Sequence, residues 1–237
     1  MIRGQSVLGV IPARGGSKGV KRKNIRRIAG KPLIAWTIDE AKKSKYIDRL
    51  ILSSEDPEII SVGQEWGCEV PFVRPEELAK DDTPGVDPVL HALERLPEKY
   101  EYVLLLQPTS PLRLVDDIDG CLELCLDRHA PACVSVTEPD KSPYWMYRLD
   151  EGGHLISLLA QESTVGYRQG LPKVYVLNGA VYVAQSSWLK GQRTFLSPET
   201  IAYIMPKERS IDIDTQIDID ICEYLLAYGS LPISKNK

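Results

Sequence analysis

The sequence contains no apolar run approaching the roughly 18 residues that a membrane-spanning helix requires. Its N-terminal segment, "MIRGQSVLGVIPARGG", also lacks the long apolar core and the cleavage pattern of a signal peptide. With 237 residues, 43% of them hydrophobic and 26% charged, the chain has the composition of an ordinary globular protein. These features predict a cytoplasmic protein that has no membrane partner.

A paired cysteine spacing is also missing. The five cysteines are odd in number, which favours reduced thiols over a disulfide framework. Cys121 and Cys125 lie four positions apart on a predicted helix, but no second pair of ligands is nearby, so we interpret them as buried apolar side chains rather than metal ligands. The histidines at positions 91, 129 and 154 stand in no catalytic pattern, and we assign none of them to catalysis.

Acidic residues are absent before Asp39, although the whole chain carries a formal net charge of -4. The segment "IPARGGSKGVKRKN", Ile11–Asn24, instead combines two consecutive glycines with five basic residues, namely Arg14, Lys18, Lys21, Arg22 and Lys23. Neither GxGxxG nor GxxxxGK[ST] is present, which excludes the dinucleotide fingerprint and the Walker P-loop. The segment is either a phosphate-binding loop or a solvated basic loop. The acidic pI of about 5.5 argues against a nucleic-acid partner.

Short β-rich runs alternate with segments of helical periodicity, which predicts an α/β doubly wound sheet whose strands are covered on both faces, as in a parallel sheet. The predicted strands are Ser6–Ile11, Arg49–Ser53, Glu69–Arg74, Tyr102–Gln107, Ala132–Thr137 and Ala180–Ala184. The predicted helices are Pro32–Lys43, Pro57–Trp66, Val86–Leu96 and Val115–Arg128. Ligands of such sheets bind beyond the carboxyl ends of the strands, where the basic glycine-rich turn lies.

We interpret residues 1–237 as a single domain that is interrupted by an irregular excursion over residues 138–178. This excursion lacks a clear period and is punctuated by proline and glycine, which is typical of a lid, a loop or an oligomerisation arm. Its aromatic residues Tyr144, Trp145 and Tyr147 suit either burial of an arm or stacking on a sugar.

Three further segments carry candidate site residues, each with a structural alternative. Gln107 ends a predicted buried strand in "LLQPTSPLR" and suits hydrogen bonding to a ligand, whereas Arg113 is equally compatible with a structural role. Asp81 and Asp82 suit either a contact with a ligand or the cap of a helix.

Asp212 and Asp214 alternate with Ile211 and Ile213 in "SIDIDT", which places both carboxylates on one face of a strand. That face is either a Mg²⁺ site or simply a polar strand face. The following Thr215 and Asp218 predict a cap at the start of the last helix.

Five ordered blocks of the chain resemble the acylneuraminate cytidylyltransferases, the CMP-sialic acid or CMP-nonulosonic acid synthetase family. The blocks are "IPARGGSKGVKRKNIRRIAGKPLIAWTI", "RPEELAKDD", "LLQPTSPLR", "LPKVYVLNGAVYV" and "SIDIDTQID". The resemblance implies a three-layer α/β/α Rossmann-like nucleotidyltransferase fold with an irregular dimerisation arm. It also implies an enzyme that joins CTP to a nonulosonic acid, gives the CMP-sugar and pyrophosphate, and uses Mg²⁺ as a cofactor.

The resemblance further implies roles for particular residues. Catalytic roles are implied for Arg14, Lys23 and Asp214, and metal binding for Asp212 and Asp214. Nucleotide binding is implied for Arg14, Gly15, Gly16, Ser17, Lys18, Asn24, Arg74, Asp82 and Gln107. Sugar binding is implied for Gln107, Arg168, Gln169, Asn178 and Tyr182. Family members of this kind are homodimers in which the position matching Arg168 meets the sugar acid in the partner's site.

The chain departs from the family pattern at two places. The turn "DDTPG" replaces a serine-rich sequence, so we expect Asp82, Thr83 or a glycine amide to take the place of the serine. Trp145 stands where some relatives have a lysine. The closest alternative function is a 3-deoxy-manno-octulosonate cytidylyltransferase, and an alternative of another class is a non-catalytic nucleotide-binding module.

Overall fold

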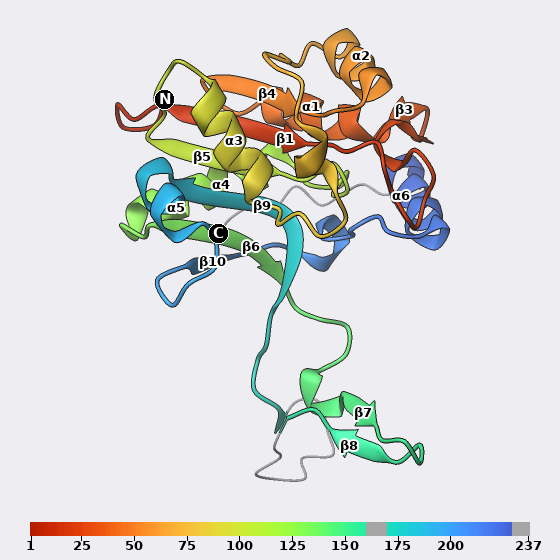
Figure 1. The fold of residues 1–237 in the computed structure, drawn as a ribbon. Helices are drawn as coiled ribbons and strands as arrows, with labels where there is room; N and C mark the ends of the chain where they lie inside the picture. Colours follow the sequence, from red (N-terminus) through yellow and green to blue (C-terminus); the bar gives the residue numbers. More distant parts are fainter. Residues whose placement is uncertain (160–169, 229–237) are drawn as a thin grey trace.

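The computed structural model describes residues 1–159 and 170–228, and this part of the chain is built around one six-stranded sheet (Figure 1). The strand order is β10-β6-β9-β5-β1-β4. The strands are β1 (Val7–Pro12), β4 (Arg49–Ser53), β5 (Tyr102–Leu106), β6 (Ala132–Thr137), β9 (Val176–Gln185) and β10 (Ile201–Ile204). Two small antiparallel pairs accompany the sheet: β2 (Arg27–Ile28) with β3 (Lys31–Pro32), and β7 (Tyr147–Leu149) with β8 (Leu155–Ser157).

The sheet is mixed rather than purely parallel. β9 runs antiparallel to both of its neighbours, β5 and β6, whereas the other neighbouring strands are parallel. The excursion after β6 explains the direction of β9. The chain leaves the sheet at the carboxyl end of β6 and returns at the same end of the strands, so that β9 runs back in the opposite direction. The start of β9 therefore lies beside the carboxyl ends of β5 and β6.

Helices cover both faces of the sheet, which confirms the predicted three-layer α/β/α architecture. The helices are α1 (Leu33–Lys42), α2 (Pro57–Glu65), α3 (Asp87–Arg95), α4 (Val115–Asp127), α5 (Ser186–Gln192) and α6 (Gln216–Tyr228). Successive residues of β1 enter opposite cores: Val7 packs with α1, α2 and α4, whereas Leu8 packs with α3 and α5. Both cores are apolar because the strands are apolar on both faces.

Some predicted elements differ from the structure. Glu69–Arg74 is not a strand, since it contributes only an isolated bridge between Glu69 and Ile51 at the edge of the sheet. The segment Ser210–Thr215 is extended but belongs to no sheet. Strand β10 and helix α5 were not predicted.

The described part of the excursion forms an arm that stands away from the sheet (Figure 1). It contains the short 3-10 helix Pro143–Trp145 and the β7–β8 hairpin. Several large apolar side chains of this arm are exposed, among them Tyr147, Leu149, Leu155, Ile156 and Tyr175. These side chains belong to none of the hydrophobic cores formed by residues 1–159 and 170–228.

All five cysteines are buried free thiols, as predicted. Within residues 1–159 and 170–228, no helix is long and apolar enough to cross a membrane.

Candidate active site

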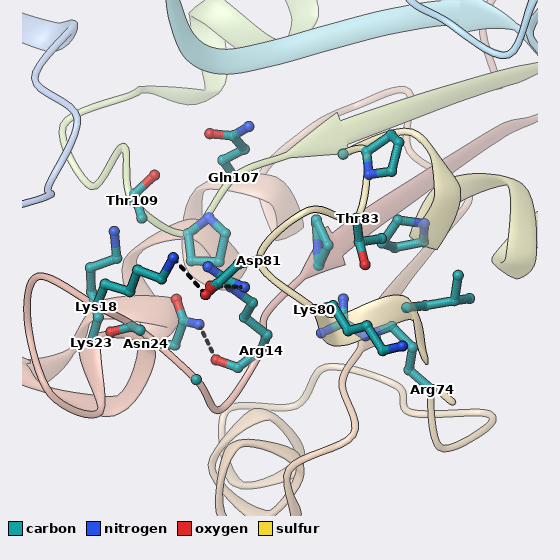
Figure 2. A pocket seen from close by; sticks show the side chains of 18 of the residues that line it. Arg14, Lys18, Lys23, Asn24, Arg74, Lys80, Asp81, Thr83, Gln107 and Thr109 are labelled. Atoms are coloured by element: carbon teal, nitrogen blue, oxygen red, sulfur yellow. Dashed lines mark hydrogen bonds and ion pairs between the residues drawn. The ribbon is translucent and has the colours of Figure 1, made fainter. Parts of the chain in front are cut away.

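The predicted basic turn lies at one end of the sheet, beside the segments that follow β4 and β5. A cavity of about 380 Å³ opens there, at the carboxyl ends of the parallel strands. Its walls come from the glycine-rich loop after β1, from residues 78–88 and from the turn after β5 (Figure 2).

The glycine-rich loop is held by specific contacts. The side-chain amide of the buried Asn24 donates to the Arg14 carbonyl oxygen at 2.9 Å, and the Gly15 amide donates to a Glu55 carboxylate oxygen at 2.7 Å. Gly19 has to be glycine, because a Cβ there would lie 2.1 Å from the carbonyl oxygen of Asp214. The loop is thus pressed against the acidic "DIDT" segment, 190 or more positions away in the sequence.

Three cationic side chains of this loop line the cavity (Figure 2). Arg14 and Lys18 both form ion pairs with Asp81 on the opposite wall, at 2.7 and 2.8 Å. Lys23 donates to the Ile213 carbonyl oxygen at 2.7 Å and to the Asp214 carboxylate at 3.0 Å. The cavity therefore holds a concentration of positive charge beside a carboxylate, which suits an anionic ligand together with a cation.

Arg74 forms a second part of the cavity lining. Its side chain is only 3% exposed, and its guanidinium donates to Glu55 at 2.6 Å, while its Nε has no hydrogen-bond partner among the described residues. Because Glu55 also accepts from Gly15, one carboxylate positions both the glycine-rich loop and Arg74. Glu55 was not singled out from the sequence.

Gln107 follows β5 and faces the cavity from the side of the sheet. Gly179, at φ +73°, lies so close that a Cβ there would be 2.7 Å from the Gln107 side-chain oxygen and 3.9 Å from the Asp212 carboxylate. Gln107 and Asp212 therefore both lie beside Gly179, at one side of the cavity. Arg113, by contrast, is buried and does not line the cavity. It donates to the carbonyl oxygens of Gln107 and Ala180. Burial lowers the pKa of Arg113 to about 10, and its role is structural.

Asp212 and Asp214 point away from the core while Ile213 between them is fully buried, so the predicted alternation is present although the segment is not a strand. The Ile213 amide donates to the Thr109 carbonyl oxygen at 2.9 Å. Asp212 is exposed as a residue, but partial burial of its carboxylate raises the pKa. The hydrogen bond from Thr109 lowers this pKa, and the charge of Asp214 raises it further.

These residues fit a Mg²⁺ ion as a donor set. Two neighbouring carboxylates beside a cavity with cationic side chains supply hard oxygen ligands, and Mg²⁺ usually completes its shell with phosphate oxygens and water. In the described part of the chain, no group of three or more His, Cys, Asp or Glu side chains is arranged to hold a metal ion. Asp212 and Asp214 would therefore leave the rest of the coordination shell to ligands from outside the protein.

The predicted sugar-side residues are placed differently. Asn178 is buried and fully engaged inside the protein: its oxygen accepts from Ser135 at 2.6 Å, and its nitrogen donates to Ser210 at 2.9 Å. Tyr182 packs against Phe195, and burial raises its pKa. Arg168 and Gln169 lie outside the described residues.

The structure brings most of the predicted site residues to one cavity. The cavity is lined by Arg14, Gly16, Ser17, Lys18, Lys23, Asn24, Arg74, Gln107 and Asp214. Gly15, Asp82, Asn178, Tyr182 and Asp212 are not among the residues that line it.

Several residues of the lining were not predicted, including Lys80, Asp81 and Thr109. Asp81 is not a helix cap, because α3 begins after Val86, and the carboxylate is paired with Arg14 and Lys18 instead. The start of the last helix agrees with prediction: Asp218 accepts from the amides of Asp214 and Thr215 at 3.0 and 2.7 Å.

Comparison with known proteins places these features in a family context. Residues 8–149 match the model of the family described as "Cytidylyltransferase". The chain is 34% identical over 224 residues to the CMP-N,N'-diacetyllegionaminic acid synthase of Legionella pneumophila, covering 93% of this chain and 96% of that protein. It is 32% identical over 220 residues to the pseudaminic acid cytidylyltransferase of Campylobacter jejuni, covering 91% of this chain and 94% of that protein.

The fold also has solved counterparts. A structure of CMP:2-keto-3-deoxy-manno-octonic acid synthetase complexed with CTP superimposes with a TM-score of 0.69 at 17% identity, covering 94% of this chain and 98% of the other. The 4-diphosphocytidyl-2C-methyl-D-erythritol synthase of Anaerococcus prevotii superimposes with a TM-score of 0.66 at 15% identity, covering 94% and 99%. At such identities the likeness concerns the fold alone.

Proposed function

Because this chain belongs to the cytidylyltransferase family, we propose that it transfers the CMP group of CTP to a nonulosonic (sialic-type) acid and releases pyrophosphate. The observation that carries this proposal is the cavity in which Arg14, Lys18 and Lys23 stand beside Asp214 and Gln107. The three cationic side chains can neutralise a triphosphate, and Gln107 can form hydrogen bonds with a second substrate.

The reaction is a direct displacement at the α-phosphorus. A bond forms between this phosphorus and the anomeric C2 hydroxyl oxygen of the sugar acid, the bond to the β-phosphate oxygen breaks, and the hydroxyl proton is released. Arg14 and Lys23 stabilise the departing pyrophosphate, whose negative charge increases as the bond breaks. Lys18 and the amides of Gly16 and Ser17 hold the phosphates in place.

Asp212 and Asp214 are the residues that would hold Mg²⁺. The ion, when bound, neutralises phosphate charge and lowers the pKa of the attacking hydroxyl. Lys23, which already contacts Asp214, holds that carboxylate next to the phosphate-binding loop.

The cytosine base binds on the side of the cavity that Arg74 lines. Cytosine offers an N4 donor together with O2 and N3 acceptors, and the buried guanidinium of Arg74 is a donor that suits the acceptors. Thr83 and Gly85, in the turn that departs from the family pattern, also line the cavity and supply backbone groups for N4. Asp82 is less suited to this role, since it is exposed and its neighbours form the lining.

The sugar is held on the side of Gln107, with Tyr182 nearby and Arg168 and Gln169 supplied by the excursion. A guanidinium holds a carboxylate bidentately, which suits Arg168 to the acid group of the sugar. Asn178 supports this region from below by fixing Ser210, two positions before Asp212.

A homodimer would cover the apolar side chains that are exposed in the described part of the arm. Several large apolar side chains of the β7–β8 arm are more than 40% exposed, a surface that is costly to leave in water and typical of an interface. In such a dimer Arg168 serves the partner's sugar pocket. Mixing Asp212→Asn subunits with Arg168→Ala subunits should therefore restore activity, because one composite site of the heterodimer is intact. No recovery despite confirmed subunit exchange would contradict the shared site.

The function is tested with purified protein, CTP and Mg²⁺, by following pyrophosphate release with a panel of sugar acids. N-acetylneuraminate, legionaminate and pseudaminate represent the nonulosonic acids, and 3-deoxy-manno-octulosonate represents the eight-carbon alternative. Release with a nonulosonic acid supports the proposal, whereas release with only the eight-carbon acid favours the alternative enzyme. No release with any acid, despite CTP binding, indicates a non-catalytic nucleotide-binding module.

A further inference from the structure

Asp81 occupies the place where the proposed function requires an anion. Its two carboxylate oxygens bind different cations: Oδ1 lies 2.7 Å from Arg14 Nη1, and Oδ2 lies 2.8 Å from Lys18 Nζ. All three side chains line the cavity, and both ion pairs cross it from the glycine-rich loop to the opposite wall (Figure 2). No step of the proposed reaction uses Asp81.

The loop that carries Asp81 is closed onto the phosphate-binding loop by these contacts. A further hydrogen bond runs from Arg14 to the Ala79 carbonyl oxygen at 3.4 Å. The loop is also folded on itself, because the Thr83 hydroxyl donates to the Glu77 carbonyl oxygen at 3.2 Å. The hydrogen bonds from Lys18 and Arg14 lower the pKa of the Asp81 carboxyl and so favour its charged form.

We propose that Asp81 is an intramolecular competitor for the nucleotide's phosphates, which sets how tightly the site binds polyphosphate. This inference rests on the proposed function, since it takes Arg14 and Lys18 as phosphate ligands. A triphosphate carries enough negative charge to displace one carboxylate from two cations. The pyrophosphate product must leave the same cations, and the returning Asp81 carboxylate favours its departure.

The expected size of the effect follows from the exposure of the two ion pairs. The Asp81 side chain is 48% exposed, and those of Arg14 and Lys18 are 34% and 78% exposed. Exposed pairs are individually weak, so removing their competition should tighten polyphosphate binding roughly two- to tenfold. The difference should shrink at high salt, because salt screens exposed charges.

The test compares the wild-type protein with Asp81→Asn, using calorimetry with inorganic pyrophosphate and with tripolyphosphate in metal-free buffer. Asp127→Asn is a matched control, because it causes the same change in net charge. It also removes one exposed ion pair, between Asp127 and Arg3. Neither of these residues lines the cavity. We expect Asp81→Asn to bind both anions roughly two- to tenfold more tightly than Asp127→Asn does. In turnover it should show a lower KM for CTP and stronger inhibition by added pyrophosphate.

Equal or weaker anion binding by Asp81→Asn, with an unchanged melting temperature, overturns the proposal and indicates that Asp81 holds Arg14 in its working position. Binding to inorganic anions does not depend on nucleotidyl transfer, so the two proposals fail separately. If Asp81→Asn binds the anions more tightly but the wild-type protein shows no turnover, only the proposed function is contradicted. If the wild-type protein turns over but Asp81→Asn binds the anions no more tightly, only the competition is contradicted.

Discussion

The buried ion pair between Asp117 and Arg209 leads to a prediction about both stability and activity. The Asp117 side chain, near the start of α4, is fully buried, and that of Arg209 is 4% exposed. Two charge-assisted hydrogen bonds join them, from Nε to Oδ2 at 2.9 Å and from Nη2 to Oδ1 at 2.7 Å. Arg209 immediately precedes the segment that carries Asp212 and Asp214, so the pair anchors the proposed metal ligands to α4.

Replacing Asp117 by Asn retains the shape of the side chain but removes the buried carboxylate charge that faces the Arg209 guanidinium. Breaking a buried pair in this way typically costs about 3–5 kcal/mol of folding free energy. For a chain of this length, that corresponds to a melting temperature lower by about 6–20 °C. Urea unfolding followed by circular dichroism measures the loss.

The double variant Asp117→Leu/Arg209→Met removes both charges and serves as the control. Such a replacement is often neutral. Here it also removes the hydrogen bond from the Leu114 amide to Asp117 at 3.0 Å, a contact of the helix-capping kind that contributes about 1 kcal/mol. The double variant should therefore be more stable than Asp117→Asn. A loss below about 1 kcal/mol in Asp117→Asn, or an equal loss in both variants, would refute the electrostatic reasoning.

The same double variant tests the anchoring role. If the pair positions the acidic segment, the variant should fold but require a higher Mg²⁺ concentration for half-maximal turnover. A purely structural role predicts an unchanged Mg²⁺ dependence.

Three further predictions concern the site and the fold. Asp212→Asn and Asp214→Asn should each lower turnover by roughly a hundredfold or more, the scale of losing a major electrostatic stabiliser; near-normal turnover of both at saturating Mg²⁺ would exclude the metal site. In competition assays CTP should be used in strong preference to UTP and ATP, and equal use of the three would contradict the base pocket. Burial and the nearby Arg95 lower the pKa of His91, which packs against Phe72. The unfolded chain therefore binds the proton more readily, and the contribution of neutral His91 to stability is present above pH about 6.5 and lost as the pH falls. His91→Gln should weaken this acid-side loss of stability in urea unfolding between pH 7 and 5, and an unchanged pH slope would contradict it.

Local patterns in the sequence predicted much of the fold and of the site. The apolar runs after Ser6 and before Gln107 form buried strands. Consecutive residues of a strand face opposite sides of the sheet, so an unbroken apolar run predicts burial on both faces. The alternation in "SIDIDT" predicted a strand with both aspartates on one face. The segment is not a strand, but Ile213 is buried and the aspartates on either side of it are exposed. The glycine-rich turn lies at the carboxyl end of the first strand because strand and turn are adjacent in the chain.

Features that depend on a distant partner were not predicted. Glu69–Arg74 has strand-like residues, yet it lies at the edge beside β4 and finds only a single bridge there. The direction of β9 follows from the point at which the excursion returns to the sheet. Asp81 resembled a helix cap because its partners, Arg14 and Lys18, are more than 60 positions away.

The sequence by itself therefore determined which segments are buried, where the basic turn lies and which family the chain resembles, because these properties depend on residue type and short spacing. Only the tertiary structure decided which charges meet. Asp117 and Arg209 are 92 positions apart, and Lys23 and Asp214 are 191 positions apart. The strength and partner of an ion pair depend on distance and burial in space, and folding sets both.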